Sequence, residues 1–441
     1  MKKIFRSLII LGMIGAVSAC SPANNNLKQM KQLRKPADAN GYVPYQELYN
    51  PDYLAFKAKM KTFAADLSET LIKQEFKEDG NVALSPISIE LCLGLAVRGA
   101  GGTTRQELLN AIGIDYETFN TYYATLFKEL SFEKKNNANK VMAQLLPTNS
   151  IWIDNDVKLL DSGLDALRDD YYCYSYEADF NDKNKESCAA IKEFTKEKTK
   201  GLIDLNLELS VNTLFVLLNT IYLKDVWNDF GDELSYASTD YKFTNRNGDV
   251  SNKRLLTGHY VEGRKMKSDS YSAFKTCTNN GFYIYFVRPN DGQDIKQIFT
   301  KETIEYVSNS KNYIYESEEL REIYFTRSIF PEFKGESDID LIKTFKEKYN
   351  VQTLFDVRCD FTNLDEGNEV YCSNFRHVAK LDVNKKGIEG AAVTYMAMDA
   401  KAAGPGEYTE VYEDFLVDKE FGFILTYGDN IIFSGITNNI D

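Results

Sequence analysis

Histidine is the scarcest ionisable residue of this sequence, because the 441 residues include two, His259 and His377, far apart in the chain. Catalytic zinc sites and cysteine or serine hydrolases depend on histidine beside other reactive groups. The motifs HExxH and GxSxG and a Gly-rich phosphate-binding loop are also missing. We therefore expect a protein that is not an enzyme and that needs neither a metal nor a cofactor.

Cysteine is sparse and irregularly spaced, with no CxxC pair. Six cysteines follow Cys20: Cys92, Cys173, Cys188, Cys277, Cys359 and Cys372. Export would permit disulfides, but a chain this long buries enough core without them, which favours free buried thiols. Basic residues are also outnumbered, 52 Lys and Arg against 65 Asp and Glu, for a net charge of −13. This balance argues against a nucleic-acid partner.

Long apolar runs are missing except near the N-terminus. There, basic residues precede a mostly apolar stretch from Leu8 to Val17, which closes on Ser18-Ala19-Cys20. The stretch is too short for a spanning helix and is typical of a signal peptide. Its end resembles a bacterial lipobox, which implies a lipoprotein signal peptide over residues 1–20 and a lipid on Cys20. We expect a lipoprotein of the bacterial cell envelope, on the outer membrane or cell surface; secretion with Cys20 unmodified is the alternative.

The rest of the chain divides into a polar lead segment and one large domain. Residues 21–51 are polar and predict a flexible tether. Apolar residues at spacings of three and four between Phe56 and Leu71 predict a helix, and Ser85-Pro86 begins a second. Thr104 and Glu107 predict a capping box at the start of a third. We find no repeat or linker within residues 52–441.

Strands dominate the later part of the chain. A continuous β-branched and apolar run over Thr213–Leu223 predicts a strand buried on both faces. Segments Phe282–Val287 and Glu322–Ile329 predict further strands, and Gly428-Asp429-Asn430 predicts a hairpin between 421–427 and 431–436. Early helices followed by strands, without regular alternation, indicate an α+β fold.

Several segments, in chain order, resemble the signatures of the serpin family. They are Asn81–Ser88 with Gly99–Thr104, Asn219–Lys224 with Trp227 and Phe230, Phe330–Phe333, His377–Asn384, and Phe415–Phe421 with Phe433–Gly435. The resemblance covers residues 52–441. It implies helices packed around a large mixed central sheet, smaller sheets, and an exposed reactive-centre loop at about 387–414.

The loop itself has a period of two. From Ile388 to Ala400 every second residue is apolar or small, and the alternate positions up to Lys401 hold all the charges. This alternation is typical of a strand with one buried face. The residues alone leave open whether the strand is permanent or inserts later; the resemblance favours insertion, a strand addition driven by stored strain. It implies a hinge and inserting segment at Gly387, Ile388, Glu389, Gly390, Ala391, Ala392, Val393 and Thr394.

The resemblance also implies a bait residue. Inhibitory serpins keep a near-constant spacing from the hinge glycine to the scissile bond, and from Gly387 that spacing ends at Lys401–Ala402. A lysine there would attract trypsin-like serine proteases. Met398 and Tyr395 are competing baits for chymotrypsin-like enzymes, and a solvated loop lysine is the plain alternative for Lys401.

Polar residues elsewhere take roles from the same resemblance. Ser85, Ser88, Asn219 and His377 would form a cluster under the central sheet where its strands part, and Trp227 would lie where the loop first enters. Strands that separate must exchange hydrogen bonds, so buried polar groups there need partners. The alternatives are ordinary buried polar residues and a plain core tryptophan.

The sequence thus favours a monomeric serine-protease inhibitor that acts as a suicide substrate. Departures from the family pattern support the alternatives: Lys385 and Lys386 replace acidic residues, Ile388 and Gly390 replace the usual side chains, and residues 402–415 are long and acidic. These features would slow insertion. The alternatives are a non-inhibitory serpin-fold binding protein, a surface lipoprotein, and an inhibitor of cysteine proteases.

Overall fold

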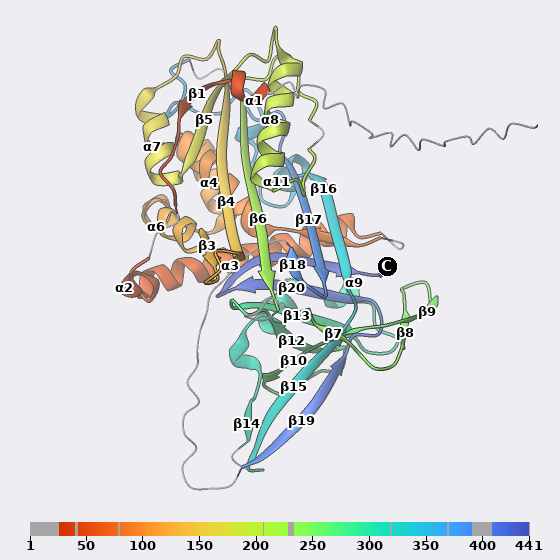
Figure 1. Cartoon of the computed structure of the whole chain (residues 1–441). Coiled ribbons are helices and arrows are strands. Elements are labelled where there is room, and N and C mark those ends of the chain that lie inside the picture. The colour runs from red at the N-terminus through yellow and green to blue at the C-terminus, as the bar shows by residue number, and fades with distance from the viewer. Residues whose placement is uncertain are drawn as a thin grey trace, which may run out of the picture.

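The computed structural model describes residues 26–39, 43–77, 80–205, 207–227, 233–317, 320–367, 370–389 and 408–440. Within these ranges, helices gather around one end of a long sheet, and two smaller sheets make up the other end (Figure 1). The α+β fold class predicted from the sequence is confirmed.

The largest sheet has eight strands in the described part of the chain. In spatial order they are β1 (Lys31–Arg34), β5 (Cys173–Ala178), β4 (Val141–Asp154), β6 (Phe215–Val226), β18 (Gly387–Glu389), β17 (Arg376–Asn384) and β16 (Phe333–Asp340), with β3 (Phe132–Lys135) paired to β4. We call this sheet A. Strands β4 and β5 run parallel, and the other ladders are antiparallel, so the sheet is mixed.

The other sheets follow the C-terminal half of the chain. One contains β14 (Glu316–Ser317), β15 (Glu322–Phe330), β10 (Leu256–Glu262) and β7 (Ser235–Tyr236), with β19 (Thr409–Leu416) parallel to β15. Another runs β11 (Met266–Lys267), β12 (Tyr271–Cys277), β13 (Phe282–Pro289), β20 (Phe421–Tyr427), β21 (Asn430–Thr437) and β2 (Val82–Leu84). Strands β8 (Tyr241–Thr244) and β9 (Val250–Lys253) form a separate pair. The predicted C-terminal hairpin is confirmed.

Helices α3, α4, α7, α8 and α9 of the following set contact the sheets directly. The set is α2 (Tyr45–Leu48), α3 (Pro51–Glu75), α4 (Pro86–Gly99), α5 (Gly102–Ile112), α6 (Tyr116–Glu129), α7 (Asp161–Tyr171), α8 (Asn184–Lys198), α9 (Ile295–Ile298), α10 (Lys301–Val307) and α11 (Ile342–Glu347). Helix α3 begins where the side chain of Asn50 accepts a hydrogen bond from the Asp52 amide and Pro51 takes the first position. Its predicted apolar stripe is buried in the main core.

The expected tether is folded where the structure describes it. Residues Asn26–Gln29 form the short helix α1, and β1 pairs with β5 at the edge of sheet A. Leu27 and Met30 pack on the apolar cluster beneath α8. Arg34 binds Asp161 at 2.6 Å and Asp165 at 2.8 Å. The prediction of a flexible tether over 21–51 is therefore wrong for residues 26–34, because strand pairing and apolar cover outweigh their polar composition.

The predicted capping box is also wrong. Helix α5 begins at Gly102, two residues before Thr104. The Thr104 hydroxyl instead lies 2.9 Å from that of Thr353, and the Glu107 carboxylate accepts hydrogen bonds from the Gln352 and Thr353 amides at 2.8 Å. Both side chains hold a distant segment because that segment offers buried amides without strand partners.

Candidate functional site

Strands β6 and β17 are joined at one end and parted at the other. The three residues of β18 pair with both: Gly387 with Val226 and Asn384, and Glu389 with Lys224 and Asp382. Beyond these pairs, no ladder among the described residues joins β6 directly to β17. Figure 1 shows β18 near the ends of β6 and β17 that face the smaller sheets.

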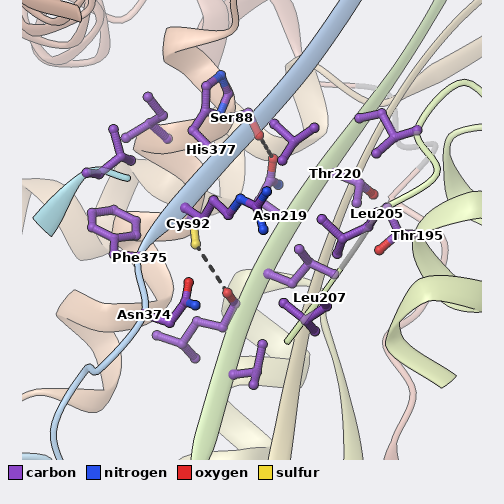
Figure 2. Close-up of a pocket in the computed structure, with 18 of the residues that line it drawn as sticks. Ser88, Cys92, Thr195, Leu205, Leu207, Asn219, Thr220, Asn374, Phe375 and His377 are labelled. Carbon is purple, nitrogen blue, oxygen red and sulfur yellow. Dashed lines mark hydrogen bonds between the residues drawn. The ribbon is translucent and has the colours of Figure 1, made fainter. Parts of the chain in front are cut away.

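A pocket of about 100 Å³ occupies this parting. Both strands and the segment after α8 line it, and Figure 2 shows Leu205 and Leu207 across the β6 ribbon from Ser88 and Cys92. This explains a departure from the prediction for β6. Residues Phe215–Leu218 are half-buried, not buried on both faces, because one edge of the strand borders the pocket.

The joined end is closely packed around the hinge glycine. A Cβ atom on Gly387 would lie 1.9 Å from the backbone oxygen of Asp225, so only glycine fits between the strands. Ile388, next in the chain, is 1% exposed. The Trp227 indole Nε1 donates to the Asn384 carbonyl at 2.7 Å, and its ring packs on Phe330. The structure thus places Trp227 at the turn from β17 into the loop.

A buried carboxylate, Asp225, supports the same end and was missed by sequence reasoning. It accepts hydrogen bonds from Asn280 Nδ2 at 2.7 Å and from Thr278 Oγ1 at 2.5 Å. Burial raises the pKa of Asp225 to about 6, although these hydrogen bonds oppose the rise. An aspartate inside an apolar run could have signalled the site, but its partners lie more than fifty residues away.

The turn before the hinge is stabilised by an ion pair in which the loop base supplies the lysine, Lys385, and not the acidic residue that the resemblance implies. Lys385 Nζ lies 2.5 Å from Glu233, its backbone amide donates to Glu332 at 2.7 Å, and its carbonyl accepts from the Leu234 amide. The charged hydrogen bond raises the pKa of Lys385 and lowers that of Glu233. A lysine where the resemblance expects an acid therefore still has an opposite charge to pair with.

The parted end contains a chain of polar side chains from four elements, α4, β6, β4 and α6. Ser88 Oγ on α4 donates to Asn219 Oδ1 on β6 at 2.6 Å (Figure 2), and Asn219 Nδ2 donates to Asn149 Oδ1 on β4 at 2.9 Å. Asn149 Nδ2 donates in turn to the Tyr123 hydroxyl, which donates to the Leu91 carbonyl. Asn149 and Tyr123 were not predicted, since no local pattern marks them as neighbours of Asn219.

The histidine of this end is buried and neutral. His377 Nε2 accepts a hydrogen bond from the Ser85 amide at 3.1 Å, and burial lowers the pKa of His377 to about 4. The hydroxyls of Ser85 and Thr220 are buried without a hydrogen-bond partner in the described part of the chain. All four predicted residues, Ser85, Ser88, Asn219 and His377, line the one pocket. Two unsatisfied hydroxyls there can accept partners from an incoming strand.

The remaining predicted residues lie outside the described ranges. They are Cys20, Gly390, Ala391, Ala392, Val393, Thr394, Lys401 and Ala402. Of the predicted hinge segment the structure therefore describes Gly387, Ile388 and Glu389. The Glu389 carboxylate accepts a hydrogen bond from the Tyr222 hydroxyl at 3.0 Å. Burial, and then the negative charge of Glu389, raise the pKa of that phenol.

The described ranges were also searched for metal sites, membrane-spanning helices and disulfides. No group of three or more His, Cys, Asp or Glu side chains there is arranged to hold a metal ion. No helix within those ranges combines the length and apolar character that crossing a membrane requires. The six cysteines from Cys92 to Cys372 are free thiols.

Comparison with known proteins identifies the family. The sequence profile described as Serpin (serine protease inhibitor) matches residues 58–440, and the chain therefore belongs to the serpin family. Serpin A3-6 of Bos taurus is 26% identical over 342 residues, which cover 76% of this chain and 78% of the relative.

Solved structures share the fold. The native state of tengpin, a thermophilic serpin, superposes with a TM-score of 0.66 at 20% identity, covering 93% of this chain and 100% of tengpin. Human thyroxine-binding globulin, solved in complex with its ligand, has a TM-score of 0.68 at 20% identity, covering 87% and 99%. The chain therefore has a serpin fold, in which β18 lies between β6 and β17, and its family is one of protease inhibitors.

Proposed function

We propose that this chain inhibits serine proteases as a suicide substrate, with the reactive loop completing sheet A after cleavage. The single observation that carries the proposal is the parting between β6 and β17, which is filled at one end by Gly387–Glu389 and open beyond Glu389. An unpaired strand edge is a template for another strand. The segment that follows Glu389 in the chain has the alternation such a strand needs.

The register of β18 predicts where each loop residue would lie once inserted. Continued in step from Gly387 opposite Val226, it sets Thr394 between Asn219 on β6 and His377 on β17. It sets Met398 opposite Phe215, the first residue of β6. The loop up to Met398 therefore has the length of the open edge.

The same register separates two faces. Residues in step with buried Ile388, among them Thr394, Met396 and Met398, would face the main core beside Leu217. Burying each methionine would contribute about 1.5–3 kcal/mol, and each ladder hydrogen bond about 0.5–1.5 kcal/mol. The alternate residues would face the cluster beneath α8. Insertion therefore lowers the free energy of the protein, and this free energy is available to displace the attached protease.

The chemistry belongs to the target. Its serine hydroxyl attacks the carbonyl of Lys401, the Lys401–Ala402 peptide bond breaks, and the new amino group of Ala402 departs. Lys401 is then an ester of the serine. Insertion carries the attached protease along the sheet before water can hydrolyse the ester. We propose Lys401 as the bait and trypsin-like enzymes as the targets, because those enzymes read a cation.

Trapping of trypsin tests the proposal. The protein is mixed with trypsin at increasing molar ratio and separated on a denaturing gel, and the released fragment is sequenced from its N-terminus. A covalent complex and a fragment beginning at Ala402 are expected. Complete cleavage without complex at every ratio would overturn trapping of trypsin, and a fragment with another first residue would overturn the bond assignment.

A non-inhibitory binding protein is the second candidate. Its support is Ile388, a large side chain at the first inserted position, together with the long acidic segment after Ala402. Thyroxine-binding globulin is a relative in fold that binds a small molecule. A loop that is cut but never trapped, in a protein whose melting temperature is unchanged by the cut, would favour this function.

We further propose that residues 1–20 direct export and that Cys20 anchors the protein by a lipid in the bacterial cell envelope, as a monomer. The proposal rests on the basic, apolar and small-residue pattern that ends at Cys20. Metabolic labelling with a tagged fatty acid should mark the wild type and not Cys20→Ser. Equal labelling of both would contradict it.

A further inference from the structure

The chain carries a folded segment ahead of the region that matches the family profile. Its strand β1 pairs with β5, and Lys31 lies opposite Glu177 and binds it in a 2.7 Å ion pair. Its helix α1 lies on α8, where the Asn26 side chain and the Leu27 amide each donate a 3.0 Å hydrogen bond to the Glu193 carboxylate. We call α1 and β1 the N-terminal segment. These contacts fix the point at which the chain leaves the body of the protein.

The register of sheet A places the N-terminal segment near the start of β6. Lys31 is the partner of Glu177 on β5, and Glu177 is the partner of Ile153 on β4. Ile153 is in turn the partner of Phe215, the first residue of β6. Neighbouring strands lie about 4.8 Å apart, so three spacings put Lys31 about 14 Å from Phe215. Figure 1 shows α1 and β1 at the end of sheet A that lies away from the smaller sheets.

The inserted loop would end close to this segment. The register of β18 sets Met398 opposite Phe215, so one more strand spacing puts Met398 about 19 Å from Lys31. Lys401 follows three residues later, at most about 10 Å farther along the chain. A protease of roughly 225 residues has a radius of gyration of about 17 Å. A protease esterified to Lys401 therefore lies beside the N-terminal segment, because its own width exceeds the remaining gap.

The intact loop is displayed at the opposite end of the molecule. Glu389 pairs with Lys224, nine residues along β6 from Phe215, and nine residues of strand span about 30 Å. On the other flank, Lys401 is seven residues before Tyr408, so it can lie no farther than about 24 Å from the start of β19. Figure 1 shows β19 beginning at the extremity of the molecule away from α1. A protease that binds the uncut bait is therefore held far from the N-terminal segment.

The proposed anchor belongs to the end of the molecule that holds α1. Cys20 is six residues before Asn26, and six residues span at most about 20 Å. A lipid on Cys20 would therefore keep the bilayer surface within about that distance of Asn26. Because α1 is attached to α8 and β1 to β5, the anchor and the far end of the inserted loop share one end of sheet A.

We propose that the anchored protein displays its intact loop away from the bilayer, and that insertion carries the acylated protease back to the bilayer, where it rests beside α1 and β1. A loop displayed in this way meets soluble proteases of the surrounding medium. Once trapped, the enzyme is retained between the edge of sheet A and the lipid surface. This inference rests on the proposed trapping mechanism and on the proposed lipid at Cys20.

Energy transfer to the bilayer tests this position. The lipid-bearing protein is held in phosphatidylcholine vesicles that contain a fluorescent acceptor lipid, and trypsin carries a donor dye. Active trypsin is compared with trypsin whose catalytic serine has been converted to dehydroalanine, which binds Lys401 but cannot form the ester. Transfer should be several-fold stronger from the trapped enzyme than from the enzyme held on the intact loop. Equal transfer from the two enzymes would overturn the inference.

A longer tether provides a matched variant. An insert of about forty Gly and Ser residues between Cys20 and Asn26 has a root-mean-square end-to-end distance of about 35 Å. Transfer from trapped trypsin should therefore fall, while the yield of covalent complex stays the same. The same insert at the exposed Asn247-Gly248 turn between β8 and β9 is the control, and it should leave the transfer unchanged.

The same samples separate the inference from the proposals on which it rests. A denaturing gel measures the covalent complex, and flotation of the vesicles measures anchoring. Covalent complex on floating vesicles with weak transfer would overturn the inference alone. Absence of covalent complex would overturn trapping of trypsin, and protein that does not float would overturn the lipid anchor; either result would overturn the inference as well.

Discussion

The two ends of the parting between β6 and β17 are held by different kinds of interaction. At the joined end, β18 supplies backbone pairs, and Gly387 and Ile388 are tightly packed. At the parted end, side chains make single hydrogen bonds: Ser88 donates to Asn219, and His377 accepts from the backbone amide of Ser85. The difference indicates that the parted end is where the sheet can exchange hydrogen bonds and admit a new strand. A ladder must break as a unit, whereas side-chain hydrogen bonds can be exchanged for those of an incoming strand.

The largest effect, on the yield of covalent complex, is expected from a charged side chain that insertion would bury at the parted end. Thr394→Arg would bring a guanidinium between Asn219 and His377 during insertion, and a buried unpaired charge costs several kcal/mol. The loop should still be cut, but the covalent complex with trypsin should fall at least about tenfold on a denaturing gel. Thr394→Ser, which keeps the hydroxyl, should trap normally. Normal trapping by the arginine variant would show that residue 394 stays outside the sheet.

Gly387→Val, at the joined end, should remove the backbone pairs of β18 and so leave that end without a ladder, like the parted end. In Gly387→Val the new side chain would collide with the Asp225 carbonyl, a backbone atom that cannot move aside. We expect expulsion of β18, a loss of about 2–4 kcal/mol in unfolding free energy, and altered fluorescence from Trp227. Gly80→Ala is the control, because its nearest neighbour would lie 4.0 Å away. An unchanged stability for Gly387→Val would contradict the packing of the hinge.

The two ends should respond to pH in opposite directions. Between about pH 6.5 and pH 4 the unfolded chain protonates His377 and the native protein does not, so native stability is lost as the pH falls. Protonation would also remove the acceptor of the Ser85 amide. For Asp225 the native protein holds a proton between about pH 4 and pH 6 that the unfolded chain has released, so native stability is lost as the pH rises.

These opposed slopes, each worth up to about 3 kcal/mol, should nearly cancel in the wild type. Asp225→Asn should expose the loss of stability in acid, and His377→Gln should expose the loss of stability as the pH rises. Denaturant unfolding at pH 4, 5 and 6 measures both. Parallel profiles for the two variants would show that the ends do not titrate as their surroundings require.

The smallest effect is expected at the turn before the hinge. The Lys385–Glu233 ion pair is partly exposed, so water and salt screen it. Lys385→Ala should change the melting temperature little, and the change should vanish at high salt. A large, salt-independent change would mean that the turn depends on this lysine for more than its charge.

The sequence predicted well what depends on local pattern. The stripe of α3 and the C-terminal hairpin were predicted because their side-chain periods match their structures. It also led to the pocket-lining residues Ser85, Ser88, Asn219 and His377, through ordered resemblance to a family. It did not predict β1, whose polar residues pair with a strand more than a hundred residues away, nor Asp225 and Asn149, whose partners are brought near by the fold. Thr104 and Glu107 gave a wrong prediction because their spacing fits a capping box, whereas in the structure both contact the distant residue Thr353.

The most direct test of the account compares the intact protein with the form cut by trypsin. If the loop fills the parting, the cut form should melt at a much higher temperature, and amide exchange should slow along Phe215–Leu223 of β6 and in Gly390–Met398. An unchanged melting temperature, with exchange in β6 as fast as before the cut, would contradict insertion of the loop into sheet A.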